Sequence, residues 1–118
     1  MPQITVDYSA PLEGAFDRQG FALALHAEVV ETAAAKIGAC KTRFRRTEDT
    51  VVGADTEGHA VVHVTLGLLA GRTEEVKAKL TEAVLDLLKI HVKQAGGLEL
   101  HASAEVRDLD PSYRKFEA

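Results

Sequence analysis

The sequence predicts an α+β fold in which a β-α-β unit occurs twice, giving a four-stranded sheet with two helices packed on one face. Four segments alternate apolar and polar residues with the period of a strand, and two longer segments repeat apolar residues with the period of a helix. A helical crossover between two strands of one sheet places those strands parallel. We therefore interpret residues 1–118 as one domain with two pseudo-repeat halves, about 1–58 and 59–118.

The first strand is predicted in the first eight residues, where Ile4, Val6 and Tyr8 alternate with polar side chains. Pro2 stands directly before it. Removal of Met1, which small second residues permit, would leave a rigid secondary amine that titrates and acts as a base if its surroundings disfavour the cation. A purely structural proline is the alternative, because the first residue of a strand need not donate a hydrogen bond.

A helix is predicted from an N-cap at Asp17 to about Lys36, with Gly38 as its end. His26 falls beside its apolar stripe and is interpreted as a partly buried structural histidine. The residues of the stripe recur every four positions: Phe21, Leu25, Val29, Ala33 and Ile37.

A short basic strand is predicted at residues 41–47, on which Arg43 and Arg45 share one face. A guanidinium is suited to binding a substrate carboxylate through two parallel hydrogen bonds. Ordinary surface ion pairs are the alternative for these arginines, and such pairs contribute little to stability.

After a polar connection at residues 51–58, the most convincing central strand is predicted at residues 59–66. His59 and His63 have the H-x-x-x-H spacing of a helical zinc site. On a strand, however, they would lie about 13 Å apart, too far to share one ion. The spacing therefore predicts no metal site.

The last third of the chain predicts a turn at residues 67–72, a helix capped by Thr73 and a final strand at residues 98–106. Gly96 and Gly97 are predicted to stop the helix. The final strand alternates without a break, which indicates one buried face.

Composition limits the function. A net charge of −4 argues against a general nucleic-acid surface, and no apolar run has the length of a membrane span. The single cysteine, Cys40, fits the reducing cytoplasm and is interpreted as a packing residue. Four strands under two helices leave sheet edges and part of a face open, which suggests assembly.

Several short motifs resemble the 5-carboxymethyl-2-hydroxymuconate isomerase family of the tautomerase superfamily. They occur in order through most of the chain: the Pro2 start, Ile37-Gly38 before Lys41-Thr42-Arg43, Val62-His63-Val64-Thr65-Leu66, and Ala70-Gly71-Arg72. The resemblance implies a homotrimer that needs no cofactor, and the single cysteine favours the cytoplasm as its location.

The resemblance also implies that Pro2 is the acid–base catalyst of a dienol-to-ketone isomerisation. Arg43 and Arg72 match family arginines that bind carboxylates, and Lys41 stands where the family usually has arginine. The expected reaction converts 5-carboxymethyl-2-hydroxymuconate, a polycarboxylate of homoprotocatechuate breakdown, to its 2-oxo-enoate isomer. The alternatives are a tautomerase for another 2-hydroxydienoate or phenylpyruvate, and a non-catalytic trimeric binding protein.

Overall fold

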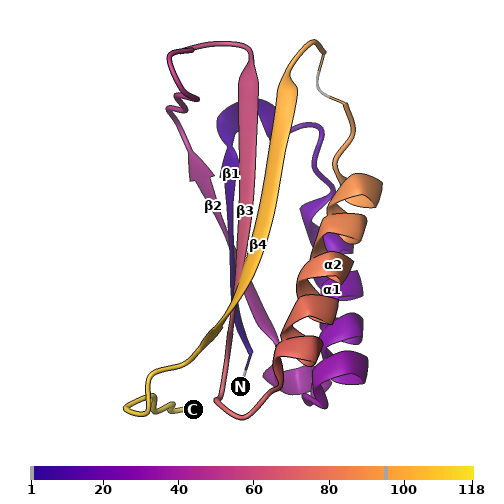
Figure 1. Cartoon of the computed structure of the whole chain (residues 1–118), viewed down its shortest axis with the longest axis vertical. Helices are drawn as coiled ribbons and strands as arrows, with labels where there is room; N and C mark the ends of the chain where they lie inside the picture. Colours follow the sequence, from indigo (N-terminus) through magenta and orange to yellow (C-terminus); the bar gives the residue numbers. More distant parts are fainter. Residues whose placement is uncertain (1, 95) are drawn as a thin grey trace.

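The computed structural model describes residues 2–94 and 96–118. Figure 1 shows four strands and two α-helices in the predicted order. The elements are β1 (Gln3–Ser9), a 3-10 turn (Ala10–Leu12), α1 (Arg18–Ala33), a second 3-10 turn (Ile37–Ala39), β2 (Lys41–Thr47), β3 (His59–Leu68), α2 (Glu74–His91) and β4 (Glu99–Asp108).

The sheet has the order β2-β1-β3-β4, and both helices cover the same face of it (Figure 1). Each half contributes one parallel pair, β1 with β2 and β3 with β4, while β1 and β3 run antiparallel at the centre. The predicted fold class is confirmed. Within the described residues, no helix is both long and apolar enough to cross a membrane.

The core lies between the sheet and the two helices. The alternating residues of β1 and β3 that face the helices are buried, and the apolar stripe of each helix packs on them. The fully buried side chains include Ile4, Val6, Phe21, Leu25, Val29, Val62, Val64, Leu66, Leu80 and Val84. We call the opposite face of the sheet the open face. It carries the polar residues that alternate with the buried residues along the same strands.

The predicted extent of α1 is wrong at its C-terminal end. Asp17 is the N-cap as expected and accepts a hydrogen bond from the Gly20 amide at 3.1 Å. The helix stops at Ala33, because Ala34 takes a left-handed conformation with φ 56°. Ile37 consequently leaves the stripe and is 60% exposed, and Gly38 falls in the following 3-10 turn.

The second half also departs from two expectations. α2 starts after its predicted cap, Thr73, but ends at His91, several residues before Gly96. The helix-facing side of β4 is not continuously buried: Leu100 is 42% exposed and Ala102 is exposed. β4 is an edge strand, so it has a neighbouring strand on one side only.

Candidate active site

Pro2 lies at the end of the sheet where β1 and β2 begin and β3 ends. It is buried, and its carbonyl oxygen accepts a hydrogen bond from the backbone amide of Lys41 at 3.2 Å. The next residue, Gln3, pairs with Lys41 on one side and with Gly67 on the other. The expected removal of Met1 concerns a residue outside those described.

Lys41 and Arg43 alternate along β2 and share the open face. The residue between them, Thr42, faces α1 instead and hydrogen-bonds His26 at 2.7 Å. Arg43 is exposed, and among the described residues its guanidinium has no hydrogen bond or ion pair. Next on this face is Arg45, whose guanidinium is held by the Asp7 carboxylate through bonds of 2.8 and 3.2 Å. Arg43 thus has its donors available for a ligand, whereas Arg45 does not.

Arg72, unlike Arg43, already makes hydrogen bonds within the described part of the chain. It is half-buried in the loop after β3, and it donates to the carbonyl oxygens of Leu69 at 3.1 Å and Ala33 at 3.0 Å. These bonds tie the end of α1 to the loop. A guanidinium has five N–H donors, so further donors remain beyond these two bonds.

The C-terminal tail, residues 109–118, also reaches this end of the sheet, as both chain ends do in Figure 1. The phenol of Tyr113 accepts a hydrogen bond from Gln3 Nε2 at 3.3 Å, and the Lys41 ammonium lies 3.2 Å from the Glu117 carboxylate. The Lys41 hydrogen bond lowers the pKa of Glu117, which keeps that carboxylate charged. Sequence reasoning missed these contacts, because the tail has no periodic pattern.

The pKa shifts of two titratable side chains near this end of the sheet have structural causes. Burial lowers the pKa of His26, as expected for a histidine beside the core. Burial also raises the pKa of the Cys40 thiol, which donates to the Lys36 carbonyl oxygen at 3.5 Å. A thiol of raised pKa is a poor nucleophile at neutral pH, which agrees with the packing role expected for Cys40.

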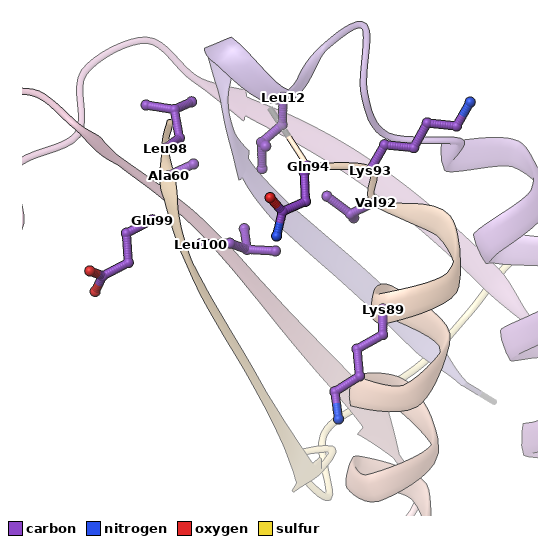
Figure 2. Close-up of a pocket in the computed structure, with 9 residues that line it drawn as sticks. All are labelled: Leu12, Ala60, Lys89, Val92, Lys93, Gln94, Leu98, Glu99 and Leu100. Atoms are coloured by element: carbon purple, nitrogen blue, oxygen red, sulfur yellow. The ribbon is translucent and has the colours of Figure 1, made fainter. Parts of the chain in front are cut away.

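A cavity of about 430 Å³ lies elsewhere, between the end of α2 and the start of β4 (Figure 2). Its lining is mostly apolar, with two lysines. The lining residues are Leu12, Ala60, Lys89, Val92, Lys93, Gln94, Leu98, Glu99 and Leu100. Because Ala60 and Leu100 lie near the beginnings of β3 and β4, this cavity is at the opposite end of the sheet from Pro2.

The duplicated β-α-β order, the mixed four-stranded sheet and the placement of both helices on one face define a tautomerase fold. A family model described as 5-carboxymethyl-2-hydroxymuconate isomerase matches residues 2–116. The chain therefore belongs to the 5-carboxymethyl-2-hydroxymuconate isomerase family and is an isomerase.

Solved structures agree with this fold. A 5-carboxymethyl-2-hydroxymuconate isomerase from Deinococcus radiodurans R1 is similar with a TM-score of 0.84 at 23% identity, over 98% of this chain and 90% of that one. A fused 4-OT symmetric trimer is similar with a TM-score of 0.71 at 22% identity, over 91% of this chain and 85% of that one. No curated protein matches the chain.

Proposed function

We propose that this isomerase converts 5-carboxymethyl-2-hydroxymuconate from its dienol to its 2-oxo-enoate form, with the amine of a processed Pro2 as acid–base catalyst. One observation carries the proposal: in a chain of this family, the buried Pro2 lies beside Lys41, and Lys41 shares a face with Arg43, whose guanidinium has no partner among the described residues. No cofactor is required for such a proton transfer.

The proposed mechanism moves one proton. The neutral Pro2 amine takes the proton of the 2-hydroxyl group, and the electron pair shifts through the diene toward a distant carbon. The prolinium then returns the proton to that carbon, which leaves a conjugated ketone. Burial and nearby cations both lower the pKa of an amine, which keeps a useful fraction of Pro2 neutral near pH 7.

The cations supply substrate binding. Arg43 and Lys41 bind carboxylates on the open face, and the remaining N–H donors of Arg72 draw electron density toward the developing 2-oxo group. Three cations suit a substrate with two or three carboxylates better than phenylpyruvate, which has one. A related 2-hydroxydienoate with two carboxylates is the alternative substrate.

Arg43 and Arg45 form a matched pair for the test, since both are exposed arginines on the same face of β2. We expect Arg43→Ala to raise KM for 5-carboxymethyl-2-hydroxymuconate at least tenfold, because a charge-assisted bidentate contact is lost. Arg45→Ala should change KM less than twofold, because its guanidinium is occupied by Asp7. Equal effects of the two substitutions would contradict the assignment.

Substrate comparison tests the reaction itself. Ketonisation of 5-carboxymethyl-2-hydroxymuconate, 2-hydroxymuconate and phenylpyruvate enol is followed by ultraviolet absorbance. The proposal predicts the highest kcat/KM for the first compound. A preference for phenylpyruvate enol would overturn the proposed substrate while leaving the isomerase class intact.

We further propose a cytoplasmic homotrimer. Two features support the trimer: β2 and β4 leave exposed strand edges, and a similar solved structure is described as a symmetric trimer.

A further inference from the structure

Two histidines and a glutamate meet on the open face at the start of β3 and β4. His59 pairs with Glu99 in the parallel register, and His101 lies two residues beyond Glu99 on the same face. His59 Nδ1 is 2.9 Å from His101 Nε2, and His101 Nε2 is 3.3 Å from a Glu99 carboxylate oxygen. One ligand atom from each residue lies within 4.8 Å of the other two.

We propose that His59, Glu99 and His101 bind a divalent first-row transition cation, of which Zn²⁺ is the natural probe. Imidazole nitrogens and a carboxylate oxygen are common zinc ligands, and three protein ligands leave a fourth position for water. With zinc–nitrogen bonds of about 2.0–2.1 Å, two nitrogens of a tetrahedral site lie about 3.3 Å apart. Binding the cation therefore requires the two nitrogens to separate by a few tenths of an ångström and the rings to turn so that both lone pairs point at the cation.

Asp55 gives an independent reason to expect a metal ligand at His59. Its carboxylate lies 2.9 Å from His59 Nε2, on the other side of the ring from His101. A proton donated from Nε2 to Asp55 leaves Nδ1 with a free lone pair directed at the proposed cation. A carboxylate behind a ligating histidine is the usual arrangement in protein metal sites.

The same carboxylate is itself held in place. Asp55 and Val52 exchange backbone hydrogen bonds of 2.9 and 3.0 Å, which fixes the turn before β3. A bound cation would thus connect three segments: this turn, the start of β3 and the edge strand β4.

The cluster is open to solvent. The side chains of His59, His101 and Glu99 are 17%, 38% and 70% exposed, so a hydrated ion can reach them. Figure 2 shows Glu99 pointing away from the cavity that Leu100 lines, toward the other side of β4. Glu99 also lines the edge of that cavity, so the cluster adjoins it on the other face of β4.

The cluster is also remote from the proposed active site. His59 lies eight residues along β3 from Gly67, which pairs with Gln3. At about 3.3 Å per residue, this places the cluster about 26 Å from the Pro2 end of the sheet. We therefore assign the cation a structural role, and the assignment does not rest on the proposed reaction.

His63 supplies the matched control. It lies on the same strand and the same face, but its ring is bonded to Ser103 at 2.7 Å and Glu105 at 2.9 Å, without a second histidine. The sequence pattern paired His59 with His63, whereas the partner that the structure gives His59 comes from β4.

The test is isothermal titration of untagged, EDTA-treated and dialysed protein with ZnCl₂, and with CoCl₂ followed by visible absorbance. We expect one Zn²⁺ per chain in the wild type and in His63→Ala. Binding should weaken at least 100-fold in His101→Ala, and about 10- to 100-fold in Asp55→Asn, which removes only the orienting charge. Circular dichroism and size-exclusion chromatography establish that each variant keeps the fold and assembly.

Saturating Zn²⁺ should also raise the Tm of the wild type and of His63→Ala but not that of His101→Ala, because a ligand of the native state stabilises it. Absence of saturable binding up to 100 times the protein concentration would overturn the proposal. So would equal Zn²⁺ affinity in the wild type, His101→Ala and His59→Gln.

Discussion

Glu117 places a carboxylate on Lys41, a side chain that we propose binds a carboxylate of the substrate. Both side chains are about half exposed, so the pair is weak and a substrate can displace it. We expect Glu117→Gln to lower KM roughly two- to fivefold with little change in kcat, because one competing charge is removed. Steady-state kinetics measure this.

Glu82→Gln is the control for that prediction, since Glu82 is an exposed glutamate of α2. An unchanged KM in Glu117→Gln, or an equal change in both variants, would show that the tail does not compete for Lys41.

We assign Arg72 two roles, one in stability and one in substrate binding, whereas Arg43 has only the second. Loss of its bonds to Ala33 and Leu69 should destabilise the protein by about 2 kcal/mol, the usual range for hydrogen bonds made by a charged group. We therefore expect Arg72→Ala to lower both the free energy of unfolding and kcat/KM. Urea unfolding and kinetics on the same preparation measure the two effects, and Arg43→Ala should show only the kinetic one.

Retention of full stability in Arg72→Ala would contradict the structural role of this guanidinium. If Arg72→Ala loses the expected stability but keeps its kcat/KM, Arg72 does not belong to the proposed substrate site.

At the scale of elements, Glu13 connects the end of β1 to β2 and to the start of α1. Its carboxylate accepts from Tyr8 of β1 and Arg46 of β2, each at 3.1 Å, and lies 2.5 Å from Arg18 of α1. The Arg46 hydrogen bond is the main reason that the pKa of Glu13 is lowered from its usual value of 4.5.

This lowered pKa predicts an acid-dependent loss of stability. Because the pKa is lower in the folded than in the unfolded state, the stabilisation is full above pH 4.5 and is lost as the pH falls through the folded value. We expect Glu13→Gln to have a lower Tm than the wild type at pH 7, and the difference to shrink below pH 4. A Tm difference that stays constant between pH 7 and pH 3 would contradict this account.

The helices and strands were largely predictable, because the apolar residues of each element recur with the period that places them on one buried face. The end of α1 was not, because it depends on a left-handed Ala34, a residue type that gives no stop signal. The exposed half of β4 was not predictable either, since Leu100 and Ala102 alternate like core residues and their exposure follows from the edge position.

The candidate site also has a part that was predictable from the sequence and a part that was not. Pro2, Lys41 and Arg43 lie in short local motifs, and the resemblance of those motifs to the family singled them out, whereas residue type and spacing alone left structural alternatives open. The Lys41–Glu117 and His59–His101 contacts join residues far apart in the chain. They depend on strand order and register, which no spacing within one segment encodes.

At the scale of the whole molecule, the exposed edges of β2 and β4 should be covered by copies of the chain. Light scattering coupled to size-exclusion chromatography should give three times the chain mass of 12.7 kDa. A monomer at micromolar concentration would contradict the proposed homotrimer.

The central claim is that the amino-terminal amine of Pro2 performs the proton transfer. Its most direct test is the ketonisation rate of 5-carboxymethyl-2-hydroxymuconate by wild type and Pro2→Ala, each shown by intact mass to lack Met1. We expect Pro2→Ala to lose about a hundredfold or more in kcat, as for the removal of a positioned acid–base group, with a normal Tm. Equal rates in the two processed proteins would contradict the claim.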